Sequence, residues 1–354
     1  MRRDSRNAFM DTLRLAASFF VVVLHVPLPG AIGELLKPIL RCAVPFFFMV
    51  SGYWLFGGET PALLARLEKR ARRAALLLAA GCAAFFAMHI GYSVLIARTG
   101  FAPALRSVWN LRAALSFFAF NNTDFFWPGG AAHLWFLAGL LYALLLLRLL
   151  LAAVPLRRLY PLIPVLLAAA VPVAFLAARR VADVQERDML TRNFLFTGLP
   201  CVLAGMWLRQ NEQALHRLPA GVAVSLPLYC AALCVIERFT SLHNPFGLAR
   251  ILLAGSLVLL SARFPAFGAG TFLPRFGARY SLMIYIIHYP IATAFKWLAG
   301  RAPPALARSG ALLVFAASLG IAAAWDICKQ KINERHEHSE EEYEEEKTGK
   351  EKTF

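Results

Sequence analysis

Charged residues are scarce in this sequence of 354 residues. Asp, Glu, Lys and Arg together make up 16% of it, whereas soluble proteins contain about 25%. Hydrophobic residues make up 59%, and Phe alone occurs 28 times. A soluble fold of this size could not keep so much apolar surface away from water. The composition excludes a secreted disulfide scaffold, a coiled coil or a disordered chain as the main body, and it predicts an all-α, polytopic membrane protein.

Acidic residues and lysine are rare over most of the chain. Residues 1–326 hold 31 Lys and Arg against 12 Asp and Glu, a net charge of +19. Residues 327–354 hold 6 cations against 9 acids, a net charge of −3. The cations stand in short clusters between apolar stretches, which is typical of loops that orient helices in a bilayer and not of a nucleic-acid partner. We expect a membrane domain at 1–326 and a charged, unfolded cytoplasmic tail at 327–354.

Cysteine pairs with the spacing of a metal site or of a secreted disulfide framework are absent. The six cysteines lie almost entirely in apolar segments, so we interpret them as small buried hydrophobic residues. His336-Glu337-His338 is only a weak metal signal in the charged tail. The sequence predicts no metal site.

Apolar segments that could cross a bilayer, which takes about 20 helical residues, recur along the chain. Ten such segments are present: 8–28, 36–57, 74–96, 133–152, 160–178, 194–209, 218–236, 247–262, 279–298 and 308–326. The basic loops, above all Arg66–Arg73, fall mostly on the side of the N-terminus. Because Lys and Arg accumulate in cytoplasmic loops, we expect about ten transmembrane helices with both termini in the cytoplasm.

The first span carries polar residues on one face. Arg14 and His25 are 11 residues apart, close to three helical turns and roughly 16 Å. Asp11 and Ser18 lie one turn to either side of Arg14. Such groups cost free energy in lipid unless they are paired or hydrated. Either Asp11 and Arg14 form a packing pair, with His25 bonded to a carbonyl group, or the whole stripe lines a functional cavity. Four polar residues on one face favour the cavity.

Polar residues also occur in three later spans and in one loop between spans. Arg41 opens the second span at the expected depth of His25, and Ser51-Gly52 further along predicts close helix packing. The cluster Arg66-Leu67-Glu68-Lys69-Arg70-Ala71-Arg72-Arg73 is either a cytoplasmic anchor, which topology alone favours, or a clamp for a polyanionic cofactor. His133 and Trp135 begin the fourth span. Ser281, Tyr285 and His288 share a face of the ninth span, either lining a cavity or bonding across helices.

These motifs, taken in order, resemble the membrane-integral acyltransferase-3 family, best known for bacterial O-acetyltransferases that act on cell-surface glycans. The resemblance spans about residues 6–326. Its most specific part is Asp11-Thr12-Leu13-Arg14 with Leu24-His25. The supporting parts are Arg41 with Val44–Tyr53, His133-Leu134-Trp135-Phe136-Leu137, and Ser281 with Tyr285–His288.

The resemblance implies an acyl-CoA-dependent O-acyltransferase in the inner (plasma) membrane of the cell. It would move an acyl group, most commonly acetyl, from cytoplasmic acyl-CoA to a hydroxyl of a cell-surface glycan or lipid-linked sugar. In that family the histidine of the first helix, here His25, is thought to be the catalytic base, and the arginine of the motif is Arg14. The Arg-x-Arg pair implicated in donor handling matches Arg70 and Arg72.

The residues themselves suggest roles that agree with this resemblance. Imidazole titrates near neutral pH, so His25 could take a proton from a sugar hydroxyl, and either Arg14 or Arg41 could stabilise the developing oxyanion. The predicted site residues are catalytic His25, Arg14, Asp11 and Arg41; donor-binding Arg70, Arg72 and Arg73; and acceptor-binding His133, Trp135, Tyr285 and His288. Trp127, Trp135 and Tyr53 are further candidates for stacking on a sugar.

A second hypothesis is a transporter or flippase for a small polar or sugar-linked substrate. Intramembrane His, Arg and Asp also suit proton-coupled carriers. The sequence shows no convincing internal similarity of the kind that inverted repeats leave in transporters. The expected partners are therefore acyl-CoA, a glycan or lipid-linked acceptor and membrane lipids, with no prediction of oligomeric state.

Overall fold

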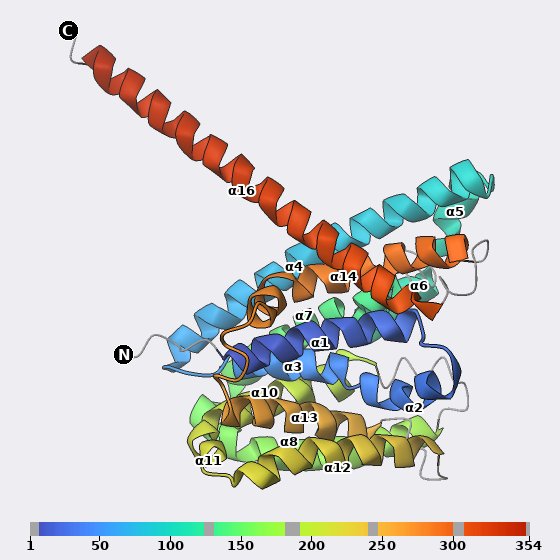
Figure 1. Ribbon diagram of the computed structural model, residues 1–354, viewed down its shortest axis with the longest axis vertical. Helices are drawn as coiled ribbons and strands as arrows, with labels where there is room; N and C mark the ends of the chain where they lie inside the picture. Colours follow the sequence, from blue (N-terminus) through green and yellow to red (C-terminus); the bar gives the residue numbers. More distant parts are fainter. Residues whose placement is uncertain (1–6, 124–130, 181–191, 240–246, 300–307, 352–354) are drawn as a thin grey trace.

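The computed structural model describes residues 7–123, 131–180, 192–239, 247–299 and 308–351 (Figure 1). All regular secondary structure in these residues is helical. The elements are α1 (Ala8–His25), α2 (Gly30–Leu40), α3 (Ala43–Tyr53), α4 (Thr60–Gly91), η1 (Tyr92–Ile96), α5 (Phe101–Val108), α6 (Leu111–Phe120), η3 (Ala132–Leu134), α7 (Trp135–Ala153), α8 (Leu156–Arg180), η4 (Phe194–Gly198), α10 (Leu199–Gln210), α11 (Glu212–His216), α12 (Ala220–Phe239), α13 (Leu248–Arg263), α14 (Leu273–Ala299) and α16 (Gly310–Glu351).

Every predicted apolar segment coincides with a helix or with consecutive helices. Six described stretches are long and apolar enough to cross a membrane: Ala8–His25, Gly30–Tyr53, Thr60–Ile96, Ala132–Ala153, Ala220–Phe239 and Gly310–Ile332. Among the other helices, α13 has only 16 residues, and α14 carries Arg275, Arg279 and Lys296. The structure supports a polytopic all-helical protein, whereas ten crossings and cytoplasmic termini remain predictions.

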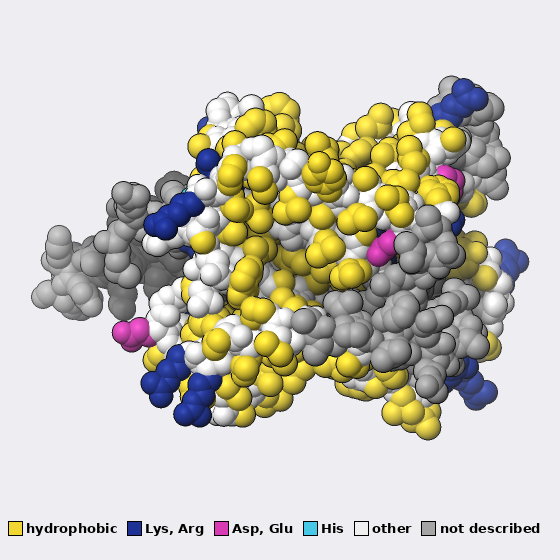
Figure 2. Space-filling view, turned by 90° about the horizontal axis from the view of Figure 1, so that it is seen from below, with side chains coloured by type: hydrophobic (Ala, Val, Ile, Leu, Met, Phe, Trp, Pro, Cys, Tyr) yellow, Lys and Arg dark blue, Asp and Glu magenta, His cyan; other side chains and the backbone are white. Residues whose placement is uncertain are grey.

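The surface of the bundle has the apolar middle that a membrane protein needs. In Figure 2, hydrophobic side chains cover the centre of the face shown, and Lys and Arg lie toward its two ends. Large apolar residues are well exposed on several helices, among them Leu149 (68%), Leu228 (67%) and Trp325 (62%). Exposed apolar surface of this extent would be unfavourable in water but not in lipid. The chain is therefore an integral membrane protein.

The ends of α1 follow from local sequence signals. The Asn7 side chain accepts a hydrogen bond from the Met10 backbone N–H at 2.8 Å and so caps the helix. Pro27 and Pro29 follow the last helical residue, and proline cannot continue a helix without losing a backbone hydrogen bond. α1 therefore ends at His25, which places the imidazole at the end of the helix opposite Asn7.

Close helix crossings hold the centre of the bundle together. A Cβ atom at Gly52 of α3 would lie 1.9 Å from the Val202 carbonyl oxygen of α10, and one at Gly205 would lie 1.9 Å from that of Met49. The predicted close contact at Ser51-Gly52 is thus confirmed. A Cβ at Gly277 of α14 would similarly lie 1.8 Å from the carbonyl oxygen of Asp11, so α1 and α14 also touch backbone to backbone.

The last helix extends beyond the predicted membrane domain at 1–326 into the charged segment. α16 continues as one helix from Gly310 to Glu351 and projects from the bundle (Figure 1). Within the bundle, Asp326 of α16 forms an ion pair with Arg279 of α14. Glu, Lys, Arg and Gln are good helix formers, so a helix that starts inside the bundle can extend into the charged segment.

The close crossing of α3 and α10 predicts the effect of one methyl group. Gly52→Ala should lower the thermal unfolding temperature of the purified protein by several degrees, because overpacking typically costs about 1–3 kcal/mol. The matched control is Gly320→Ala in α16, where a Cβ atom would meet nothing within 4 Å. An equal unfolding temperature for the two variants in detergent would contradict this packing.

Candidate functional site

Two of the cavities in the described bundle are lined by predicted site residues. The first, which we call the arginine cavity, has a volume of about 400 Å³ and is lined by Arg14, Arg70, Arg73 and Arg279 together with apolar residues of α3, α4, α7 and α14. The second, the histidine cavity, has a volume of about 200 Å³. Its lining includes His25, His133, Trp135 and the cations Lys37, Arg41, Arg192 and Arg250. Both cavities are thus electropositive, and only the second one holds imidazole groups.

Tyr285 of α14 lines both cavities. Among the described residues it is the one that both linings share. Its hydroxyl donates a hydrogen bond to the His133 carbonyl group, and its ring packs edge-on against Phe136 with the centroids 5.3 Å apart. Phe136 lines the arginine cavity, and His133 lines the histidine cavity. Tyr285 therefore forms part of the wall between the two spaces.

The polar stripe of α1 is divided between the two cavities. Arg14 lines the arginine cavity, whereas His25 lines the histidine cavity. Asp11 is buried, and its Oδ1 atom lies 3.1 Å from Nη1 of Arg14. Ser18 is also buried, and its hydroxyl donates to the Leu15 carbonyl group of its own helix. Asp11 therefore positions the Arg14 guanidinium group, and Ser18 contributes no group to either cavity.

Three histidines that are distant in the sequence form one cluster, the histidine cluster. Ring centroids are 5.1 Å apart for His25 and His288, 5.3 Å for His133 and His288, and 6.5 Å for His25 and His133. Tyr289 stacks on His133 at 4.8 Å and meets His25 edge-on at 5.0 Å. Sequence reasoning missed Tyr289, although its position four residues after Tyr285 gave a usable signal.

Backbone carbonyl groups fix the protons of two of these rings. Nδ1 of His288 lies 2.7 Å from the Tyr285 carbonyl oxygen, and Nε2 of His133 lies 3.2 Å from that of Ile286. A carbonyl group can only accept, so in the neutral ring each of these nitrogens carries the hydrogen. The opposite nitrogens, Nε2 of His288 and Nδ1 of His133, are buried and have no hydrogen-bond partner among the described residues. Both rings therefore offer an acceptor nitrogen inside the cluster.

The arginines of the basic cluster in α4 differ in what they contact. Arg70 donates from Nη1 to the Ser51 carbonyl group and from Nη2 to that of Trp54, each at 2.8 Å. It thereby satisfies carbonyl groups that the end of α3 leaves without helical partners, although it also lines the arginine cavity. Arg72 and Arg73 are both exposed, but Arg73 lines that cavity as well, whereas Arg72 belongs to neither lining. Arg279, which the sequence analysis did not select, takes a place in the lining.

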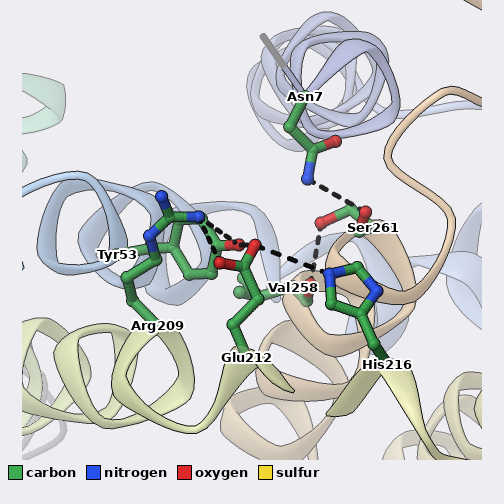
Figure 3. A network of polar contacts seen from close by, with 7 residues as sticks. All are labelled: Asn7, Tyr53, Arg209, Glu212, His216, Val258 and Ser261. Atoms are coloured by element: carbon green, nitrogen blue, oxygen red, sulfur yellow. Dashed lines mark hydrogen bonds and ion pairs between the residues drawn. The ribbon is translucent and has the colours of Figure 1, made fainter. Parts of the chain in front are cut away.

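Tyr53 is not a sugar-stacking surface, so that suggestion is wrong. The residue is fully buried, and its hydroxyl donates to Oε1 of Glu212 at 2.5 Å. Arg209 donates to the Tyr53 oxygen at 3.2 Å and to Oε2 of Glu212 at 2.6 Å (Figure 3). These contacts tie α3 to α10 and α11 instead of binding a ligand. Trp127 lies outside the described residues, whereas Trp135 is half-buried in the histidine cavity.

Asn121, which no motif identified, supports the histidine cavity from outside its lining. The residue is fully buried directly after α6 with a left-handed backbone (φ 53°). Its amide nitrogen lies 3.3 Å from the Trp135 carbonyl oxygen and 3.4 Å from that of Arg192. Its side-chain oxygen accepts a hydrogen bond from the Phe194 backbone N–H at 2.8 Å. One buried amide therefore positions two segments that line the cavity.

The described residues contain no group of three or more His, Cys, Asp or Glu that could hold a metal ion. A family model described as an acyltransferase domain matches residues 7–324, which include both cavities and the histidine cluster. No curated protein and no solved structure matches the chain. Because the family model covers nearly the whole bundle, the chain belongs to the acyltransferase-3 family and is a membrane acyltransferase.

Proposed function

We propose that the protein transfers an acyl group from acyl-CoA, bound in the arginine cavity, to a hydroxyl of a glycan or lipid-linked sugar in the histidine cavity. The observation that carries this proposal is that Tyr285 lines both cavities. A donor and an acceptor that enter from opposite ends of the bundle would bring their reacting atoms together there. Membership of an acyltransferase family supports the reaction class.

The arginine cavity suits an acyl-CoA donor. Coenzyme A carries several phosphate charges, and guanidinium groups bind phosphate oxygens through charge-assisted hydrogen bonds. Arg14 and Arg73 supply such groups, while Leu137, Leu140 and Leu144 supply apolar walls for the pantetheine arm. α1 begins and α16 leaves the bundle at this end, so a cytoplasmic N-terminus would place the cavity on the cytoplasmic side of the inner membrane.

His25 is the proposed base in the histidine cavity. Its neutral imidazole takes the proton of the acceptor hydroxyl as that oxygen attacks the thioester carbonyl carbon. The tetrahedral intermediate then collapses, the carbon–sulfur bond breaks, and the imidazolium returns the proton to the departing sulfur. The products are the ester and free coenzyme A. Arg41 lines the same cavity as His25, whereas Arg14 lines the other one, so this geometry favours Arg41 for stabilising the oxyanion.

His288 is the proposed positioning residue for that base. Its Nδ1 hydrogen is directed to backbone carbonyl groups, which leaves Nε2 as an acceptor beside the His25 ring. An N–H of His25 donated to this nitrogen would orient the second ring nitrogen of His25 toward the acceptor hydroxyl. This is the role that an orienting group plays for a histidine base in other acyl-transfer enzymes.

Replacing the proposed base should separate catalysis from donor binding. His25→Ala should lower acyl transfer by about 10²–10⁴-fold, the usual contribution of a general base, and leave the Kd for acetyl-CoA within about twofold. The measurements are mass spectrometry of cell-surface glycans from cells that carry each variant, and acetyl-CoA binding to purified protein. The control is His216→Ala at the end of α11, outside both cavity linings. Full acylation by His25→Ala would contradict the proposal, and unchanged glycans in cells without the protein would favour transport.

Two adjacent arginines provide a matched test of the donor site. Arg73→Ala should raise the Kd for acetyl-CoA about tenfold, because Arg73 lines the arginine cavity. Arg72→Ala removes the same charge from the next position, outside the lining, and should change that Kd by less than about threefold. An equal loss of affinity in both variants would mean that the cluster acts through its net charge, and a larger loss for Arg72→Ala would place the donor elsewhere.

A further inference from the structure

The histidine cavity combines a small volume with an unusual concentration of positive charge. Lys37 of α2, Arg41 directly after α2, Arg192 before η4 and Arg250 of α13 all line its volume of about 200 Å³. No Asp or Glu occurs among the described residues of this lining. These cations come from separate parts of the chain, so the fold gathers them there. Like charges in a confined space repel one another unless an anion compensates them.

These cations also have partners within the protein. Lys37 lies 3.8 Å from Glu34, but both side chains are substantially exposed, and such pairs contribute little. Arg41, Arg192 and Arg250 each have further interactions within the protein, and all three also line the cavity. The backbone of Arg192 is held by Asn121, whose amide nitrogen lies 3.4 Å from its carbonyl oxygen.

We propose that the histidine cavity selects an anionic acceptor. Its negative group, either a carboxylate on the sugar or the diphosphate of a lipid-linked sugar, would bind Lys37, Arg192 and Arg250, with Arg41 left for the oxyanion. The histidine cavity has about half the volume of the arginine cavity, which suits one sugar unit with its charged group better than the bulkier coenzyme A. The inference rests on the proposed function for the acceptor role, but the preference for anions can be measured without acyl transfer.

The test compares pairs of probes in which one member carries an anionic group that the other lacks. Purified protein in nanodiscs of neutral phosphatidylcholine would be titrated with methyl glucuronide against methyl glucoside, and with polyprenyl-diphosphate glucose against polyprenyl glucoside. The charged member of at least one pair should bind about tenfold more tightly than its neutral partner, and added salt should weaken this preference. The first pair reports a carboxylate on the sugar, and the second reports the lipid diphosphate.

Variants connect the preference to the cavity. The double variant Lys37→Gln with Arg192→Gln should reduce the charged-to-neutral ratio of affinities below about threefold, whereas Lys37→Arg, which keeps the charge, should retain it. Arg106→Gln on α5 is exposed and outside the lining, and it should also retain the ratio. Thermal unfolding of each variant, together with its affinity for acetyl-CoA, verifies that the fold is intact.

Three results would overturn the inference. They are equal or undetectable binding of both members of both pairs, a preference that survives the double variant, and a loss of acetyl-CoA binding in an otherwise stable double variant. The last result would make the histidine cavity the donor site. An anion preference that depends on Lys37 and Arg192 in a protein with no acyl-transfer activity would support the anion site and reject the proposed function, so the two failures are distinguishable.

Discussion

An ionisable side chain within a bilayer costs free energy unless a partner or water compensates it, and most of the site follows from this constraint. Asp11 compensates Arg14 on the first helix. Arg70 compensates the carbonyl groups at the end of α3. The histidine cluster is different, because its buried acceptor nitrogens on His133 and His288 have no partner among the described residues. Such groups are unfavourable in a resting core and useful beside a proton-transfer site.

The helices that carry the two cavities pack backbone to backbone. Gly277 lets α14 touch α1 near Asp11, and the ring of His25, at the end of α1, lies 5.1 Å from that of His288, further along α14. α1 and α14 therefore run side by side and together carry residues of both cavities. Tyr285, between the contact levels of Gly277 and His288, then lies between the arginine cavity and the histidine cavity. The separation of the two cavities thus follows from the packing of this helix pair.

Helical periodicity revealed much of this arrangement in advance. The spacing of Arg14 and His25 predicted a shared face, and the structure places both beside cavities. Periodicity identifies a face but not the helix that packs against it. Tyr53, as an aromatic residue, suggested a surface for stacking on a sugar. Its hydroxyl instead binds Glu212, 159 positions away in the sequence. The roles of Arg72 and Arg73 and the support from Asn121 likewise depend on tertiary contacts that one sequence does not specify.

The most direct measurement of the two-cavity account is an experimental structure with a non-hydrolysable acyl-CoA analogue bound. The account predicts the nucleotide phosphates at Arg14 and Arg73, the pantetheine arm in the arginine cavity, and the acyl carbon beside Tyr285 within reach of the His25 ring. A nucleotide bound among Lys37, Arg192 and His25, or an acyl chain directed out to lipid, would contradict it.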